Sequence, residues 1–309
     1  MKIISNMSVS KQLLNTVDLF SGCGGLSLGF QNAGFNILAA YDNWRLALDV
    51  YQRNFDHNAH VFDLSDIQAS VEHVKEYNPN VIIGGPPCQD FSIAGKRIEK
   101  DRANLTVAFA EIVASVSPDI MVMENVYSIE RSKSLGIAKS VLSDAGYGLT
   151  SRVIDASRTG VPQMRKRFFL VAAKGFKDDD FGAYLDQGLT ERRMTVAEYF
   201  GDEIEVEFYY AHPRSYKRRA IFSVHEPSAT IRRVNRPIPA NYVRHPADKA
   251  DVGDCVRVLT TEERSRIQTF PKEFIFEGSM SQREHLIANA VPVKMAQYVA
   301  EKVLAHWIS

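Results

Sequence analysis

The sequence predicts an α/β fold, in which a mostly parallel sheet carries helices on both faces and a smaller, loop-rich domain follows. Short apolar runs alternate with helix-like stretches from residue 16 to about residue 174. Strands that alternate with helices form mostly parallel sheets covered on both faces. After about residue 178 the alternation stops, and five prolines fall between Pro213 and Pro246. With 309 residues, the chain is long enough to bury a sizeable core.

The strands of the first domain are predicted from short apolar runs. These runs occupy residues 16–20, 35–42, 81–85, 119–125, 149–155 and 167–173. Helices are predicted between them, where apolar residues recur at spacings of three and four. The predicted helices cover residues 44–55, 105–116 and 137–146.

Regular structure returns near the C-terminus. Thr260 or Thr261 is placed to cap a helix that Pro271 would end. Residues 293–308 carry an apolar stripe at helical spacing, which must dock on something apolar, most simply the sheet. We therefore expect one domain to combine residues 1–180 with 285–309, and residues 181–284 to form the second domain and its hinge.

Composition narrows the class of protein. The apolar fraction of 45% and the charged fraction of 24% are ordinary for a soluble globular protein. The N-terminus lacks the apolar stretch of a signal peptide, and no segment is long enough to span a bilayer. Cys23, Cys88 and Cys255 lie far apart and form no CxxC pair, which argues against disulfides or a zinc site. We expect a cytoplasmic protein without a structural metal.

The charge distribution indicates an anion-binding segment. Formal net charge is zero, yet eight Lys or Arg and a single acid, Glu226, lie between Ala211 and Ala247. Balanced chains with one strongly basic segment often keep a local anion-binding face. The alternative is a solvated loop with scattered arginines.

A glycine-rich turn follows the first predicted strand in DLFSGCGGLSLGF, residues 18–30. A strand that runs through such a turn into a helix lets the backbone approach a nucleotide-like ligand closely. Asp42 ends the second strand about 20 residues later, where an acid accepts hydrogen bonds from ribose hydroxyls. The Lys and Ser or Thr of a Walker loop are absent from the motif. A dinucleotide or an adenosyl compound is therefore favoured over ATP.

Three further motifs lie at predicted strand ends. Cys88 follows the third strand in VIIGGPPCQDFS, and Glu124 ends the next strand in ENV. Taken alone, Cys88 would be interpreted as a small buried residue and Glu124 as an ordinary solvated acid. At the carboxyl edge of one parallel sheet, however, both would face the ligand crevice. In QMRKR, residues 163–167, an extended backbone would put Gln163, Arg165 and Arg167 on one face.

Together, six motifs resemble the ordered motif series of the DNA cytosine-5 methyltransferases, of the bacterial restriction-modification type. In chain order they are DLFSGCGG, GGPPCQDFS, ENV, GVPQMRKR, RVLTTEERSRIQTFP and NAVPV. Each alone is weak, but six in the family's order are highly specific. The resemblance runs from residue 16 to the C-terminus and is interrupted between about residues 175 and 256, where the family has its variable target-recognition region.

The resemblance implies a Rossmann-like methyltransferase fold that uses S-adenosylmethionine to methylate C5 of cytosine in a short duplex DNA sequence. In the family the thiolate, here Cys88, adds to C6, while the carboxyl, here Glu124, holds N3 and the exocyclic amine. Arg165 contacts the base or orients Glu124, and Arg167 supports the same pocket. Addition and release of the thiolate split one difficult step into easier ones. The target atom is out of reach inside a duplex, so the cytosine must be flipped out.

The resemblance also implies a cofactor site, with Asp42 on the ribose and Asp63 near the adenine amine. The implied cofactor-binding residues are Phe20, Gly22, Gly24, Gly25, Asp42, Asp63, Leu64, Pro86, Leu105, Asn289 and Ala290. Ala288 departs from the family glycine, and its methyl group is expected to crowd the turn or demand a different backbone angle. A second departure is Asp42, where the family usually has Glu. The adenine-stacking aromatic is unassigned, because Asn43 rather than Trp44 follows the acid.

Double-stranded DNA is the implied partner, and the family adds the expectation of a restriction endonuclease acting on the same site. We expect a monomer without membrane association. Arginine contacts bases and phosphates alike, so the sequence does not sort the two roles. The implied DNA-binding residues are Gln89, Ser92, Gln163, Arg214, Lys217, Arg218, Arg219, Arg232, Arg233 and Arg236.

Three rival functions stay open at this point. The RNA-directed branch of the family shares the Cys, the Glu and the arginine pair, although the long proline- and arginine-rich segment favours DNA. A catalytically silent DNA-binding relative would not need these residues intact. An NAD-dependent oxidoreductase would explain the glycine turn and Asp42, but not PPCQ, ENV and QMRKR.

Overall fold

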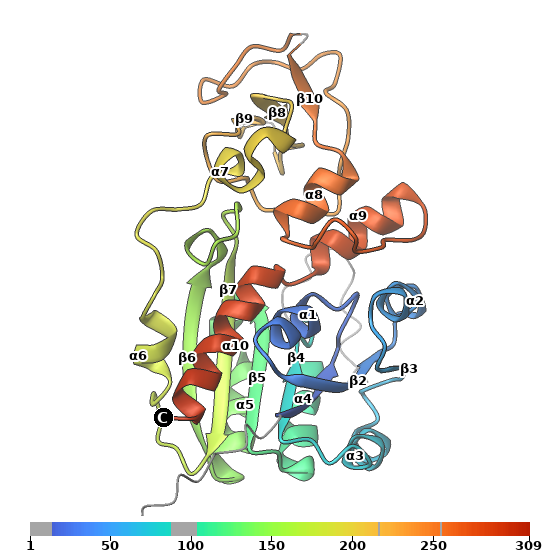
Figure 1. Cartoon of the computed structure of the whole chain (residues 1–309), viewed down its shortest axis with the longest axis vertical. Helices are drawn as coiled ribbons and strands as arrows, with labels where there is room; N and C mark the ends of the chain where they lie inside the picture. Colours follow the sequence, from blue (N-terminus) through green and yellow to red (C-terminus); the bar gives the residue numbers. More distant parts are fainter. Residues whose placement is uncertain (1–13, 88–103, 216, 254) are drawn as a thin grey trace, which may run out of the picture.

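The computed structural model describes residues 14–87, 104–215, 217–253 and 255–309. Within this part of the chain, a seven-stranded sheet forms the centre of the larger domain (Figure 1). Its strands are β1 (Asn15–Leu19), β2 (Asn36–Asp42), β3 (Asn58–Val61), β4 (Val81–Gly84), β5 (Ile120–Val126), β6 (Tyr147–Asp155) and β7 (Lys166–Lys174). Their order is β3-β2-β1-β4-β5-β7-β6. Strands β1 to β5 pair in parallel, and β7 runs antiparallel to β5 and β6, which confirms the mostly parallel sheet.

Helices cover both faces of this sheet, as predicted. Alternate residues of β4 supply the two cores: Val81 and Ile83 join one cluster, and Ile82 joins the other. The first face carries α1 (Gly25–Asn32), α6 (Gly182–Asp186) and α10 (Val293–Trp307). The second face carries α3 (Ile67–Lys75), α4 (Leu105–Val116) and α5 (Lys133–Asp144). Helix α2 (Arg45–Asn54) packs at the β2 side of the sheet.

The C-terminal helix docks on the sheet domain, which confirms the expectation from its apolar stripe. Helix α10 crosses in front of the sheet beside α1 (Figure 1). The two helices approach so closely that a Cβ at Gly29 would clash with Ala296 and with the Val293 carbonyl oxygen. Glycine at position 29 therefore lets the end of the chain return to the first domain.

The second domain is smaller and has its own core. A three-stranded sheet in the order β10-β8-β9 is built, within the described residues, from β8 (Phe208–Tyr210), β9 (Ile221–Ser223) and β10 (Val256–Val258). Helix α7 (Val196–Phe200), the 3-10 turn η3 (Gly201–Glu203) and helix α8 (Thr261–Ile267) complete it. Two other 3-10 turns, η1 (Tyr127–Arg131) and η2 (Ala156–Arg158), follow β5 and β6 of the larger domain. Side chains from α7, β8, β9, α8 and α9 (Met280–Asn289) share one apolar cluster. Helix α9 thereby links the two domains (Figure 1).

The structure corrects the sequence prediction at several elements. Strand β3 and helices α3, α6, α7 and α9 were not predicted. Helix α8 is capped by Thr260, through a capping box with Glu263, and it ends at Ile267 rather than at Pro271. It ends early because Thr269 adopts a left-handed backbone, with φ of 62°. Helix α6 packs on α10 through Leu185, although residue 181 was expected to open the second domain.

Candidate active site

The glycine-rich turn after β1 forms the floor of a cavity. Phe20 has a φ of 60°, which is rare for a bulky residue, and Gly24 caps α1 with a φ of 95°. A Cβ at Gly24 would clash with the ring of Phe55. Asp42, at the end of β2, braces the turn by accepting hydrogen bonds from Gly22 N and Trp44 N, both at 2.8 Å. The turn is thus held in a shape that exposes its backbone to a ligand.

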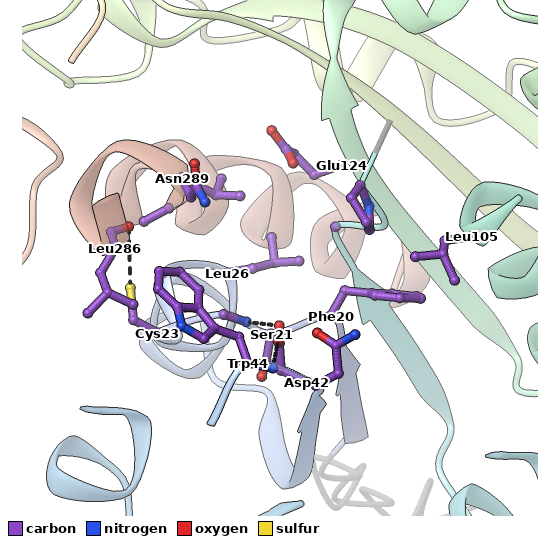
Figure 2. A pocket seen from close by; sticks show the side chains of 17 residues that line it. Phe20, Ser21, Cys23, Leu26, Asp42, Trp44, Leu105, Glu124, Leu286 and Asn289 are labelled. Atoms are coloured by element: carbon purple, nitrogen blue, oxygen red, sulfur yellow. Dashed lines mark hydrogen bonds between the residues drawn. The ribbon is translucent and has the colours of Figure 1, made fainter. Parts of the chain in front are cut away.

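The cavity above this turn has a volume of about 260 Å³ and brings together residues from both ends of the chain. Figure 2 shows Phe20, Asp42 and Trp44 on one side and Glu124 and Asn289 on the other. Seven of the sequence-predicted cofactor residues line it: Phe20, Gly22, Gly25, Asp42, Leu105, Asn289 and Ala290. Sequence reasoning missed other lining residues, namely Ser21, Cys23, Leu26, Asn43, Trp44, Gly85, Pro87, Leu286 and Val291.

Four predicted cofactor residues lie away from the lining of this cavity. Gly24 faces Phe55, and Leu64 is buried in the core beneath the second face of the sheet. Asp63 is exposed and accepts a hydrogen bond from Ser65 N at 3.0 Å, which lowers its pKa. Pro86 offers its carbonyl oxygen to Asn125, and the neighbouring Pro87 lines the cavity in its place.

The polar and aromatic groups of the cavity suit a ligand that carries hydroxyl groups and an aromatic ring. Ser21 Oγ is buried and has no hydrogen-bond partner among the described residues, so it is free to bond a ligand. Burial raises the pKa of Asp42, against the backbone N–H bonds that lower it. Each Asp42 oxygen accepts one backbone N–H and retains capacity for a further donor such as a hydroxyl. Trp44 adds an aromatic wall.

Glu124 lies at the far rim of the cavity and is paired with an arginine from the adjacent strand. Arg167 Nε lies 2.9 Å from Glu124 Oε1, and both side chains are largely buried. The antiparallel pairing of β5 with β7 produces this contact. Arg167 is opposite Val126, and Glu124, two residues before Val126, has its side chain on the same face of the sheet. Burial raises the pKa of Glu124, while Arg167 and Arg165 oppose that shift. A carboxyl of this kind is poised to hold a proton or a hydrogen-bonded base.

Arg165 and Gln163 join the two domains instead of facing the cavity. Arg165 Nη1 donates to Ile231 O of the second domain at 3.3 Å, and its Nη2 donates to Ala288 O at 2.9 Å and to Ala290 O at 3.2 Å. Gln163 is fully buried; its side chain donates to Gln268 Oε1 at 2.7 Å and accepts from Ile231 N at 2.9 Å. Gln163, predicted to contact DNA, therefore makes its hydrogen bonds inside the protein.

Ala288 departs from the family glycine without distorting the backbone. It is the penultimate residue of α9, with its methyl group buried in the core of the second domain. No positive φ is needed there. The expected crowding of a turn is therefore wrong, because the position is helical.

A buried polar chain supports the glycine-rich turn from below. Ser27 Oγ donates to Asp18 Oδ2 at 2.5 Å, and Tyr51 Oη donates to Ser27 Oγ at 2.7 Å. Tyr51 Oη also lies 2.6 Å from His57 Nε2. Burial raises the pKa of Asp18 to about 8, so this carboxyl keeps its proton at neutral pH.

A second, basic cavity of about 570 Å³ opens between the two domains. It meets the first at Asn289, and Glu124 of the first is paired with Arg167 of the second. Its charged lining comes from β7 and from the basic segment of the second domain: Arg165, Lys166, Arg167, Arg214, Arg218, Arg219, Arg232 and Arg233. Lys217 and Arg236 are exposed outside this lining.

The basic side chains of this cavity fall into two groups. Arg219 is neutralised by Glu226 through two hydrogen bonds of 2.9 Å, and its guanidinium lies 4.3 Å from the ring centre of Phe222. Arg232 donates to the backbone oxygen of His212. By contrast, Arg214, Arg218 and Arg233 have no carboxylate partner in the described ranges, and they are exposed. These three are available to an anion.

The motif around Cys88 is only partly visible. Cys88, Gln89 and Ser92 lie outside the described residues. Gly85 borders Glu124, since a Cβ built on it would lie 3.4 Å from Glu124 Oε2. Pro87, which directly precedes Cys88 in sequence, lines the same cavity as Glu124.

A glycine-floored cavity, a buried carboxyl and a basic cleft thus adjoin in the motif order noted above, and the comparison with known families agrees. The family model described as C-5 cytosine-specific DNA methylase matches residues 14–305. The chain belongs to this family. The identification made from its motifs is confirmed, and the protein is an enzyme that transfers the methyl group of S-adenosylmethionine to C5 of cytosine in DNA.

Individual relatives extend this match over almost the whole chain. The chain is 52% identical to the Type II methyltransferase M.HgiDI of Herpetosiphon aurantiacus, over 95% of each protein. It is 50% identical to M.HindV of Haemophilus influenzae, over 94% of this chain and 96% of that one. A solved structure of a putative DNA modification methyltransferase from an E. coli prophage has a TM-score of 0.70 at 21% identity, covering 96% of this chain and all of that one. That likeness supports the fold.

Among the described residues, no helix is both long and apolar enough to cross a membrane.

Proposed function

We propose that this methyltransferase recognises one short duplex DNA sequence and flips a cytosine out of it for methylation, as part of a restriction-modification system. Its similarity to two Type II methyltransferases, at 52% and 50% identity, supports this assignment. A cognate restriction endonuclease would act on the same site. We further propose that the enzyme acts as a monomer in the cytoplasm of a bacterial cell, where its DNA lies.

We propose that the two domains, each with its own apolar core, have different functions. Residues 1–180 and 285–309 form the catalytic and cofactor-binding domain, and residues 181–284 form the target-recognition domain and hinge. Helix α6 refines this boundary, because its packing on α10 attaches it to the catalytic domain. The basic cavity between the domains is the proposed DNA site.

S-adenosylmethionine is proposed to bind in the cavity above the glycine-rich turn, where it supplies an activated methyl group. Asp42 would accept hydrogen bonds from the ribose hydroxyls, and Trp44 is the proposed aromatic wall for the adenine. Ser21 Oγ would bond a further polar atom of the cofactor. The motif resemblance alone supports a cofactor role for four residues that do not line the cavity: Gly24, Asp63, Leu64 and Pro86.

The proposed chemistry assigns each protein group a separate task. Cys88 adds as a thiolate to C6 of the flipped cytosine, forming a Cys–C6 bond and placing electron density on C5. Glu124 holds N3 and the exocyclic amine, and its raised pKa favours donation of a proton toward N3. Arg167 keeps Glu124 oriented. Once C5 is methylated, loss of its proton and departure of the thiolate restore the aromatic ring.

DNA contacts are proposed for the free cations of the basic segment, Arg214, Lys217, Arg218, Arg233 and Arg236, and, on the motif resemblance, for Gln89 and Ser92. Arg219, Arg232 and Gln163 make their hydrogen bonds to other residues of the protein, so we propose that they shape the site without contacting DNA. Because arginine serves both bases and phosphates, the free group combines both roles.

The observation that carries this proposal is the contact between the two cavities. The Glu124–Arg167 pair joins the glycine-floored cavity to the arginine-lined one, so the methyl donor and the DNA would meet at one buried carboxyl.

Bisulfite sequencing of DNA from a host that expresses the enzyme tests the proposal. We expect 5-methylcytosine at one cytosine of one short sequence, with purified enzyme transferring radiolabel from S-adenosylmethionine to duplexes of that sequence. Methylation scattered without a common sequence would contradict sequence recognition. Label appearing in RNA alone would contradict DNA as the substrate.

A further inference from the structure

An exposed tyrosine, Tyr127, lines the basic cavity. Tyr127 is 56% exposed, and no other Phe, Tyr or Trp side chain in the described ranges is exposed. Aromatic residues usually bury most of their area, so an exposed ring on a ligand-facing wall is informative. The mechanism proposed above gives this residue no task.

The position of Tyr127 relative to the catalytic carboxyl is set by the sheet. Tyr127 opens η1 immediately after β5 and lies three residues beyond Glu124. At about 3.3 Å per residue, the two Cα atoms lie within about 10 Å of each other. Tyr127 also lines the basic cavity together with Val126 and Arg167. The ring is therefore at the edge of the place where a flipped cytosine would enter.

The surroundings of Tyr127 indicate which kind of partner the ring meets. The same cavity is lined by Lys166, Arg214, Arg218 and Arg233, none of which pairs with a carboxylate among the described residues. An apolar protein partner would have to bury these unpaired cations at high cost. A nucleic acid satisfies both features, since phosphates pair with the cations and bases present π-faces to the ring.

We propose that Tyr127 stacks on the nucleobase next to the target cytosine in the same strand. Extrusion of the cytosine uncovers one face of that neighbour, and an aromatic ring covers it without requiring a particular base. Tyr127 is then a stacking residue that stabilises the flipped complex. This inference rests on the proposed function, because it needs a flipped cytosine.

DNA affinity of four variants tests the inference. The probe is an unmethylated duplex that contains the target sequence of the enzyme. S-adenosylhomocysteine replaces the methyl donor, so that no turnover occurs. Removal of one stacking partner weakens nucleic-acid binding by about 5- to 150-fold, and we expect a rise of this size in Kd for Tyr127→Ala. Tyr127→Phe should bind as the wild type does, and Tyr127→Leu as weakly as the alanine variant. Tyr184→Ala, on α6 away from the cavity, serves as the matched control and should leave the Kd unchanged.

A second arm identifies the base. In duplexes with an abasic position on either side of the target cytosine, the wild type should lose more affinity than Tyr127→Ala at one of the two positions. Equal losses in both proteins at both positions would overturn the proposal. Wild-type affinity in Tyr127→Ala, or full recovery in Tyr127→Leu, would overturn it as well.

The outcomes separate this inference from the proposed function. Wild-type enzyme that methylates no duplex site would contradict the proposed function itself. Normal methylation together with wild-type DNA affinity in Tyr127→Ala would overturn the stacking role alone. Binding of S-adenosylhomocysteine, measured in each variant, reports that the catalytic domain is folded.

Discussion

At the scale of single residues, the site depends on two carboxyls, one paired with an arginine of the neighbouring strand and one hydrogen-bonded to backbone N–H groups. Glu124 is buried beside Arg167, and Asp42 accepts one backbone N–H from Gly22 of the glycine-rich turn and one from Trp44, two residues after Asp42 itself. Both carboxyls have raised pKa values because burial penalises their charged forms. Substitution by the isosteric amide tests the role of each carboxyl.

Replacement of Glu124 by glutamine should impair chemistry. The amide keeps the shape but no longer shares a titratable proton with N3, and loss of a general acid typically costs about 10²- to 10⁴-fold in rate. Single-turnover methylation of a saturating duplex measures this rate. A Glu124→Gln rate within threefold of the wild type would contradict the assigned role.

Replacement of Asp42 by asparagine should weaken cofactor binding. The side-chain amide must turn one N–H toward a backbone donor or the ribose, and hydrogen bonds to charged groups contribute about 1.5–3 kcal/mol. We therefore expect the Kd for S-adenosylmethionine, measured by calorimetry, to rise by about one to two orders of magnitude. Asp49→Asn, which changes a partly exposed acid on α2, is the control. Equal affinities in the two variants would remove Asp42 from the site.

At the scale of elements, the turn after β1 is supported by the chain Asp18–Ser27–Tyr51. Asp18 is protonated in the folded enzyme up to about pH 8 but ionises near pH 4 in the unfolded chain. At a pH between these two pKa values, unfolding releases the proton of Asp18. The free energy of unfolding should therefore fall as pH rises from about 4 to 8.

Asp18→Asn removes this titration while preserving the size of the side chain. Its free energy of unfolding, from urea titrations at several pH values, should decline less steeply across that range than that of the wild type. Parallel curves for the two proteins would show that Asp18 titrates normally in the folded state.

The elements that the sequence predicts are those whose burial pattern is local. Apolar runs at β1, β2, β4 and β5 and the stripe on α10 are visible without any tertiary context. Strand β3, with the sequence NAHV, lies at the sheet edge and is half exposed, so it carries no apolar run. Helix α9 is largely polar, although its capping box at Ser279 and Gln282 was a readable signal.

The site was predictable to the extent that motifs carry it. Asp42 and Glu124 follow from their places at strand ends, and Phe20 from the motif resemblance, whereas Trp44 was missed because it is not adjacent to the acid. The turn that bonds Trp44 N to Asp42 brings the indole into the cavity. The pairing of Arg219 with Glu226 depends on the fold of a loop-rich domain, which composition does not specify.

At the scale of the whole molecule, the Lys and Arg side chains of the basic segment form two groups. Some are paired with acids or backbone oxygens of the protein, and the others have no carboxylate partner among the described residues. The basic segment carries the free side chains into the cleft between the domains, where they face the buried carboxyl of the catalytic domain. DNA affinity should therefore depend on salt through the free group alone.

Arg233→Gln should lower the slope of log K against log salt concentration by about 0.9 if that side chain pairs with a phosphate. Arg244→Gln is the matched control, because Arg244 is already paired with Asp251 at 2.9 Å. Fluorescence anisotropy across a salt series gives both slopes. An equal effect of the two substitutions would contradict the division into free and paired cations.

The central claim is that Cys88 and Glu124 act together on a flipped cytosine at the junction of the two cavities. A duplex with 5-fluorocytosine at the target position tests it most directly, because the fluorinated C5 has no proton to lose and the thiolate adduct cannot be released. With S-adenosylmethionine present, intact-mass spectrometry should find a stable enzyme–DNA adduct for the wild type and none for Cys88→Ser. Normal methylation of the unmodified duplex without any adduct on the fluorinated one would contradict the account.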